Sequence, residues 1–163
     1  MRGKLFVGIL LAFCVVFGAG LYWFQNYAYY GTTEGLTEVE VYGDFFPVSD
    51  YQGIDAETSP LKMRACFTVD WDYAPSLEYR EMATPLTAPG WFDCFDAEQI
   101  TGDIRLGIAT VYLAEPNDPY GFDRFIAHYE DGDAFMWRQI NGCGEAAFKG
   151  DPLPPECPPE PET

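Results

Sequence analysis

The sequence has 163 residues, of which 26 are Asp or Glu and only 9 are Lys or Arg, so its formal net charge is −17. Hydrophobic residues make up 48% of the chain and aromatic residues 17%, which excludes a wholly disordered protein. Arg2 and Lys4 are the only basic residues of the first 30, so the remainder carries a formal charge of 7 − 26 = −19. Such a surface repels phosphates and argues against nucleic acid as a partner.

A membrane-spanning helix is predicted at the N-terminus. Residues 5–24 carry no charge, and a helix of that length spans roughly 30 Å, the thickness of a bilayer's hydrocarbon core. Arg2 and Lys4 precede the apolar run, and the first acid is Glu34. The positive-inside rule therefore predicts a cytoplasmic N-terminus, with everything after about residue 30 across the membrane. A cleaved signal peptide is the alternative, but its apolar region is usually only about 7–15 residues long.

Two features of residues 1–30 bear on how this predicted anchor would contact its surroundings. Gly8, Ala12, Val15 and Ala19 would form a face of small side chains, which permits close packing of membrane helices but also arises easily by chance. Aromatic residues at the exit of the helix suit the lipid headgroup layer. The predicted interfacial aromatics are Tyr22, Trp23, Tyr27, Tyr29 and Tyr30.

Residues 31–150 are predicted to form a small α+β domain built on an antiparallel sheet. Residues 61–69 alternate, with Arg64 and Cys66 on the polar face, while residues 106–113 are apolar enough for a central strand. The Asp131-Gly132 pair favours a two-residue hairpin turn, and Asp96 is placed to cap a helix. The expected elements are strands over 38–42, 61–69 and 106–113, a helix over 96–104, and a hairpin over 122–140.

Four cysteines on the exported side, Cys66, Cys94, Cys143 and Cys157, predict two disulfides, with Cys14 left in the membrane helix. Three pairings are possible. Cys66–Cys94 with Cys143–Cys157 is the topologically simplest, and zinc is disfavoured because no CxxC pair occurs. Residues 151–163 contain six prolines and predict an extended Pro-rich tail. That tail is either a strap held by Cys157 or a ligand for a partner's groove.

No catalytic, metal-ligating or cofactor-binding residue is predicted. His128 is the only histidine and is expected to be a surface residue of a strand, and no nucleophile elbow, phosphate loop or HExxH motif occurs. Acid clusters are expected to be solvated surface; they are Asp93, Asp96 and Glu98, then Asp118 and Asp123, then Glu130, Asp131 and Asp133. Aromatic residues near acids could anchor a basic partner or form the core. They are Trp71, Tyr73, Tyr79, Trp91, Phe92, Phe95, Tyr120 and Trp137.

Several stretches together resemble an uncharacterised, alphaproteobacterial-type family of bacterial single-pass membrane proteins with a periplasmic domain of unknown function. They are the basic start with its anchor, IDAETSPLKMRACF at 54–67, WFDCFDAE at 91–98, YGFDRFIAHYEDGDAFMWRQINGCG at 120–144, and CPP at 157–159. All four exported cysteines fall inside these stretches. The resemblance implies the anchored architecture and assigns no activity, cofactor or catalytic residue.

The function expected from these features is that of a non-enzymatic accessory or assembly subunit of an integral membrane protein complex, in respiratory or photosynthetic electron transfer. Its acidic periplasmic domain would dock on partner proteins, including a basic one such as a c-type cytochrome. The alternative is a membrane-tethered periplasmic domain that binds a small ligand or a cation, in a pocket lined by Trp91, Trp137 and carboxylates. An enzyme ranks third.

Overall fold

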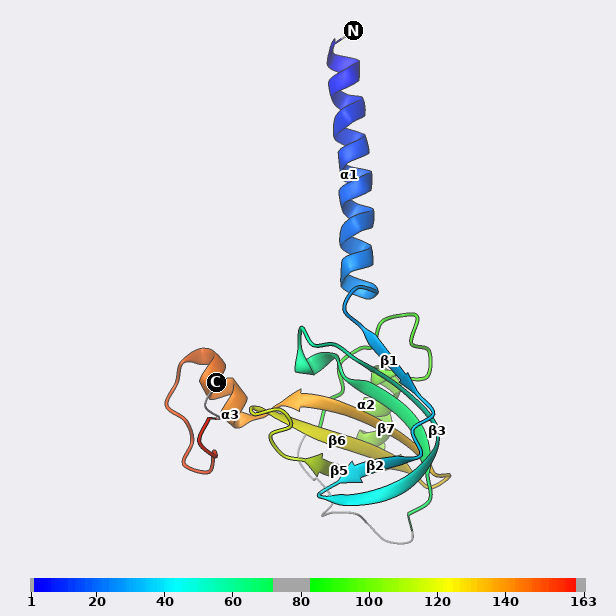
Figure 1. Cartoon of the computed structure of the whole chain (residues 1–163), viewed down its shortest axis with the longest axis vertical. Coiled ribbons are helices and arrows are strands. Elements are labelled where there is room, and N and C mark those ends of the chain that lie inside the picture. Colours follow the sequence, from blue (N-terminus) through cyan, green and yellow to red (C-terminus); the bar gives the residue numbers. More distant parts are fainter. Residues whose placement is uncertain (1, 72–82, 161–163) are drawn as a thin grey trace. The chain divides into compact units, whose positions relative to one another are not determined.

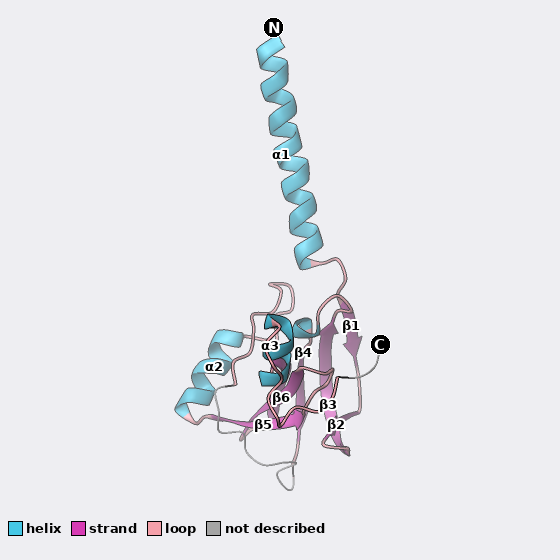
Figure 2. Cartoon of the chain, turned by 90° about the vertical axis from the view of Figure 1, so that its left-hand side faces the viewer, coloured by secondary structure: helices cyan, strands magenta, loops and turns pink. Residues whose placement is uncertain are grey.

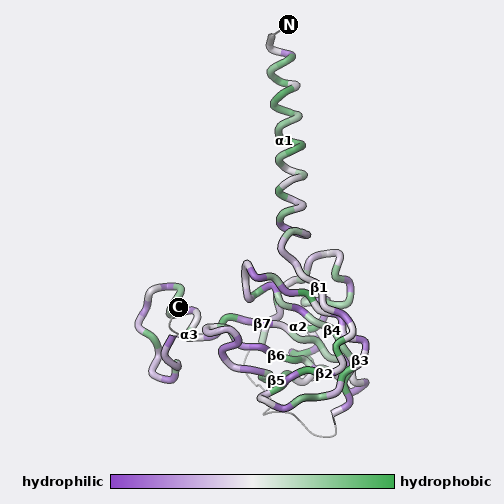
Figure 3. The backbone as a smooth tube through the Cα atoms, in the orientation of Figure 1, coloured by the Kyte–Doolittle hydropathy of each residue, from purple (hydrophilic) through white to green (hydrophobic). Residues whose placement is uncertain are grey.

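The N-terminal apolar helix is confirmed. The computed structural model describes residues 2–71 and 83–160, and the chain divides into two compact units, residues 1–30 and 31–163. Helix α1, Arg2–Asn26, fills the first unit and is apolar along most of its length (Figure 3). Its segment Gly3–Asn26 has a mean hydropathy of 2.5 and is, by length and composition, the one described helix able to cross a membrane.

The second unit is an antiparallel sheet domain, as predicted, with two helices and a short 3₁₀ turn (Figure 1). The strand order is β1-β3-β4-β7-β6-β5, and β2 pairs with the outer edge of β3. The strands are β1 Gly31–Glu34, β2 Glu38–Val41, β3 Asp44–Asp55, β4 Arg64–Val69, β5 Ala109–Glu115, β6 Phe122–Tyr129 and β7 Asp133–Ile140. The other elements are η1 Pro60–Lys62, α2 Ala97–Leu106 and α3 Gly142–Lys149.

The sheet curls so far that its two ends meet. The backbone N–H of Tyr42, in the turn between β2 and β3, donates a hydrogen bond of 2.8 Å to the carbonyl of Ala114 in β5. Every strand except β1 then contributes apolar side chains to the enclosed face, and their burial stabilises the curled form. This inner core consists of Val39, Val41, Phe46, Tyr51, Met63, Ala65, Phe67, Val69, Ala114, Ile126, Ala134 and Met136.

The outer face of the sheet is covered by α2 and by residues 83–96 (Figure 2). Phe125 and Trp137 stack there with ring centroids 5.9 Å apart, and Phe95 of the covering segment meets Phe135 edge-on at 6.1 Å. The Tyr129 hydroxyl donates to Asp103 of α2 at 2.9 Å. Burial, together with this hydrogen bond, raises the pKa of Tyr129, so the hydroxyl keeps its proton and holds the helix at neutral pH.

Strand β4 differs from its predicted form because both of its faces are covered. Pro60–Lys62 form a 3₁₀ turn, so the strand begins at Arg64 rather than Leu61. Arg64 is only 3% exposed, and its guanidinium donates to the carbonyl of Leu86 at 2.7 Å and lies over the ring of Phe95. The residue predicted to face solvent instead ties the covering segment to the sheet.

Strand β5 is an edge strand, and the prediction of a central strand over 106–113 is wrong. Leu106 ends α2, and Gly107 caps that helix in the left-handed conformation before the strand begins at Ala109. The helix itself is confirmed: the Asp96 carboxylate accepts hydrogen bonds of 3.0 Å from the N–H groups of Glu98 and Gln99.

The β6–β7 hairpin is confirmed, but its turn has three residues rather than two. Tyr129 ends β6 and Asp133 begins β7, with Gly132 at a φ of +93°. A turn of three residues closed by a left-handed Gly is the next commonest hairpin connection. It shifts the register by one relative to the predicted turn, so that Arg124 pairs with Arg138.

Three elements have no counterpart among the predicted ones: β1, β3 and α3. Strand β3 contains Pro47 and a bulge near Asp50, whose φ is +53°, and these interrupt the alternation that marks a strand. Helix α3 begins after Asn141, whose side-chain oxygen accepts from the Gly144 N–H at 3.0 Å. Residues 151–160 form neither helix nor strand.

The two predicted disulfides are confirmed, Cys66–Cys94 and Cys143–Cys157. The first joins β4 to the segment that covers the outer face, and its cysteines are 28 residues apart. The second joins α3 to the tail, across 14 residues. The first therefore belongs to the main core, and the second staples a peripheral element.

Replacing Cys66 and Cys94 together by Ala is expected to lower the free energy of unfolding by about 3 kcal/mol, because the unfolded chain is then no longer constrained by the loop that this disulfide closes. The matched variant Cys143→Ala/Cys157→Ala should change global stability less and expose residues 142–160 to protease, since local elements open separately from the core. Denaturant titration and limited proteolysis of the full chain measure both effects. Equal losses of global stability would contradict this division.

Candidate functional site

The predicted membrane contacts lie on and after α1. Gly8, Ala12, Val15 and Ala19 are exposed within the chain, as are Tyr22 and Trp23 of its last turn. The helix ends where the N–H groups of Tyr27 and Ala28 both bond to the carbonyl of Trp23. The roles proposed for these residues in packing and at the headgroup layer stay predictions.

Three of the six described aromatic residues considered for docking are buried in the core. Trp137 is fully buried, Phe95 is 5% exposed and Phe92 is 9% exposed. A ligand pocket lined by Trp137 is therefore wrong, because that ring lies between the sheet and its cover. Trp91 and Tyr120 are half-buried, and Tyr73 and Tyr79 lie outside the described residues.

His128 is half-buried rather than a free surface residue. Its ring stacks on Trp71 with centroids 4.6 Å apart, on the inner face of the sheet. Trp71 also meets Phe46 and Tyr112 edge-on, at 5.9 Å and 5.2 Å. These rings close one end of the curled sheet. The buried Nε2 of His128 has no hydrogen-bond partner among the described residues, and its ring packs against Trp71.

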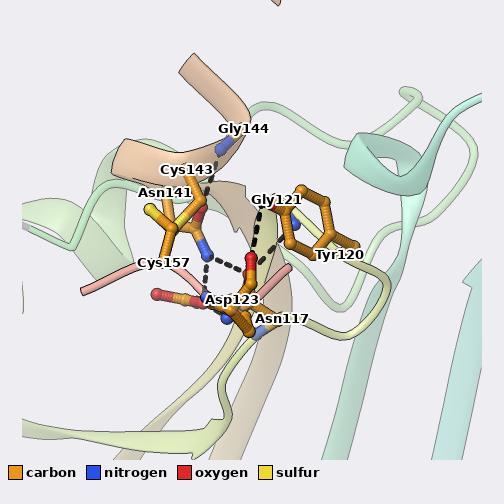
Figure 4. The surroundings of a disulfide bond; sticks show 9 residues. Asn117, Tyr120, Gly121, Asp123, Asn141, Cys143, Gly144 and Cys157 are labelled. Atoms are coloured by element: carbon orange, nitrogen blue, oxygen red, sulfur yellow. Dashed lines mark hydrogen bonds between the residues drawn. A yellow bond between two sulfur atoms is a disulfide. The ribbon is translucent and has the colours of Figure 1, made fainter. Parts of the chain in front are cut away.

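The acids flanking the 119–121 turn have structural partners. Asp123 accepts hydrogen bonds from the side chain of Asn141, at 2.6 Å, and from the backbone of Asn117, at 3.0 Å (Figure 4). Asn141 also donates to the Asn117 side chain at 3.0 Å. This network fixes the start of α3 beside the turn, next to Cys143–Cys157. In the ranges 2–71 and 83–160, no group of three His, Cys, Asp or Glu side chains is arranged as a metal site requires.

A cleft opens at the end of the curled sheet opposite Trp71. Its volume is about 260 Å³, slightly below the roughly 300–1,000 Å³ usual for small-molecule sites. Its lining combines two arginines with carboxylates, a tyrosine and apolar side chains. The lining residues are Thr33, Leu36, Glu38, Val39, Glu40, Tyr51, Gly53, Ile54, Asp55, Met63, Arg124, Met136 and Arg138.

Arg124 and Arg138 face each other across β6 and β7 in this cleft. Their side chains are only 17% and 15% exposed. Asp118 lies between them, with Oδ2 at 3.3 Å from Arg124 Nη1 and 3.6 Å from Arg138 Nη2. Arg138 Nη1 also donates to Asp55 at 2.8 Å, and Arg124 Nη2 donates to the Glu40 carbonyl at 3.3 Å.

The arrangement leaves donors unused. The Nε atoms of Arg124 and Arg138 are buried and have no acceptor among the described residues. Like charges placed directly opposite on neighbouring strands are destabilising, a repulsion that Asp118 and Asp55 offset here, and buried donors without acceptors lower stability. The pair thus resembles a recognition site more than a stabilising structural pair.

Tyr51 forms one wall of the cleft, and Gly53 makes room for it. A Cβ at Gly53 would lie 2.8 Å from both Cε1 and Oη of Tyr51, so the ring runs along β3 over the glycine. The other side of the ring stacks on Phe67 at 5.8 Å. Burial raises the pKa of Tyr51 despite the opposing effect of Arg124, so at neutral pH its hydroxyl is a neutral donor.

This site was not predicted from the sequence because the pairing of the two arginines depends on the length of the β6–β7 turn. A two-residue turn would have placed Arg124 opposite Gln139, and only the three-residue turn brings the two arginines together. The spacing of Arg124 from Ile126 and of Arg138 from Met136 was a usable signal, since each arginine falls on the inward-facing positions of its strand.

The outer surface of the second unit is acidic because its basic side chains are turned inward or paired. Of the basic residues described after residue 30, only Arg105 and Lys149 are exposed, and Lys149 bonds to Glu145 at 2.9 Å. Exposed carboxylates occur on several elements, for example Glu57, Glu98 and Glu130. The ratio of acids to bases is therefore higher among the exposed residues than in the sequence.

Gly53→Ala is expected to destabilise the protein by about 1–3 kcal/mol, because the added methyl overlaps a buried, stacked ring. Gly90→Ala is the matched control, since a Cβ at Gly90 meets nothing within 4 Å and should change stability by less than about 0.5 kcal/mol. In a Tyr51→Leu background the penalty of Gly53→Ala should shrink. A penalty that persists undiminished there would contradict the geometry.

Comparisons of the chain with the curated proteins and with the solved structures found no match. Residues 36–158 match DUF6446, which is described as a family of unknown function. The matched range runs from just before β2 to the tail beyond Cys157, so it includes both disulfides and most of the cleft. The chain therefore belongs to DUF6446, a family of unknown function.

Proposed function

We propose that this protein is a non-enzymatic accessory or assembly subunit of a membrane protein complex, anchored by α1, whose acidic domain docks on a basic partner. A respiratory or photosynthetic electron-transfer complex is the proposed setting, and a basic periplasmic protein such as a c-type cytochrome is the proposed kind of partner. Complementary charge accelerates encounter and selects among partners more than it raises affinity.

The observation that carries this proposal is the separation of charge within the second unit. Exposed charged side chains are mainly carboxylates, while Arg64 is buried and Arg124 and Arg138 lie in the cleft. An acidic domain whose bases are hidden presents a nearly uniform negative field, which suits a basic protein surface.

We also propose that the domain is periplasmic and the N-terminus cytoplasmic, in a bacterial inner membrane. Two observations support it. The disulfides suit an oxidising compartment, and the charges flanking α1 are basic before it and acidic after it.

A membrane-tethered small-ligand domain is the second candidate function, favoured by the cleft with its two arginines. The two candidates are compatible, because the cleft occupies one end of the sheet and exposed carboxylates occur elsewhere. Loss of one function would leave the other intact.

Extraction of the full chain in mild detergent at low salt is expected to give stoichiometric co-migration with a membrane complex on native electrophoresis. The contact should weaken at high salt, because exposed charges are screened at separations of about 10 Å or more at 0.1 M. Mass spectrometry identifies the partner. A chain that migrates alone at low salt after gentle extraction contradicts the accessory function.

A reporter fused after Thr163 tests the orientation independently. Enzymatic activity is expected only for a reporter that requires the periplasm, and the same fusion should stay in the membrane fraction. Arg2→Glu/Lys4→Glu is the informative variant, because reversing these charges should lower the fraction of correctly oriented chains. A cytoplasmic signal from the unaltered chain would overturn the proposed topology.

A further inference from the structure

We infer that the cleft between β2, β3 and the β6–β7 hairpin is a binding site for a small monocarboxylate that carries an apolar group. The inference deepens the second candidate function and does not depend on docking. Its starting point is the placement of Arg124 and Arg138, the only described arginines after residue 30 that lie side by side.

The arginines supply more donors than the protein uses. Each guanidinium has five N–H donors, and the protein acceptors of the two arginines are Asp118, Asp55 and the Glu40 carbonyl. Both Nε atoms also lack a described acceptor but are buried, so a ligand in the cleft would bond to the Nη groups. A planar ligand carboxylate matches the guanidinium fork and forms strong charge-assisted hydrogen bonds.

The rim of the cleft selects a single negative charge. Glu38, Glu40 and Asp55 surround the arginines, and the whole domain is strongly acidic. A dianion such as phosphate or a dicarboxylate would meet this repulsion with its second charge. A monocarboxylate would bring its one charge to the arginines from the cleft, beside Asp118, which already bridges them, and would leave nothing charged near the rim.

The remaining walls suit an apolar group. Val39, Ile54, Met63 and Met136 line the cleft together with Leu36. Methionine side chains adapt to ligands of different shape. Tyr51 is neutral at ordinary pH and adds one hydroxyl donor. A volume of about 260 Å³ limits the ligand to a small molecule.

The test is calorimetric titration of the full-length protein in lipid nanodiscs with three probes, acetate, 3-methylbutanoate and benzoate. The two carboxylates with apolar groups should bind more tightly than acetate. The matched amide, 3-methylbutanamide, and inorganic phosphate should bind at least roughly tenfold more weakly than 3-methylbutanoate, because a charged hydrogen-bond pair is lost or a second charge is repelled.

Arg138→Met should weaken binding of 3-methylbutanoate by roughly tenfold or more, while Arg105→Met, an exposed arginine of α2, should leave it unchanged. Arg138→Lys keeps the charge but loses the fork, and an intermediate affinity is expected. Tyr51→Phe removes only a hydroxyl and preserves packing, so it tests the site even if Arg138→Met fails to fold.

Three results would overturn the inference. One is the absence of heat with all three carboxylates at millimolar concentration, and another is equal weakening by Arg138→Met and Arg105→Met. Equal affinity for 3-methylbutanamide would keep the cleft as a ligand site but remove the carboxylate class. None of these results bears on salt-sensitive co-migration, so failure of the docking function is recognised separately.

Discussion

The register of the β6–β7 pair determines which side chains lie in the interior of this domain. Its register places Ile126 and Met136 in the inner core, stacks Phe125 on Trp137 under the outer cover, and sets Arg124 opposite Arg138. A slip of one residue would exchange the two faces of a strand and remove all three arrangements together. The three residues of the hairpin turn therefore govern both the packing and the cleft.

Apolar burial in the curled sheet offsets the electrostatic repulsion that the acidic composition causes. A domain with a formal charge of −19 repels itself when compact. Burying apolar side chains on two faces of one sheet, with a disulfide joining the outer cover to β4, opposes that repulsion. The few basic residues are consequently free for the interior, where Arg64 fixes a loop and the other two arginines line the cleft.

The sequence was sufficient for the features that have local chemistry. The apolar helix, the capping role of Asp96, the hairpin and both disulfide pairs follow from composition, spacing and redox compartment. The sequence was insufficient for features that depend on contacts between segments far apart in the chain. The burial of Arg64 depends on Leu86 and Phe95. The edge position of β5 depends on the pairing of strands that are distant in the sequence. Strand β3 was not predicted because its bulge interrupts the alternation of polar and apolar residues. The cleft depends on a register that differs by one residue from the favoured turn.

The Cys143–Cys157 disulfide affects how proteolytic cleavage of this protein can be detected. A protease that cuts between Gly150 and Glu156 would leave the C-terminal piece covalently attached to α3. Nicked and intact chains would then have almost the same mass under oxidising conditions and separate only after reduction. Processing of the C-terminus is thus invisible on a non-reducing gel, and a tag placed after Thr163 would report the presence of the chain rather than its continuity.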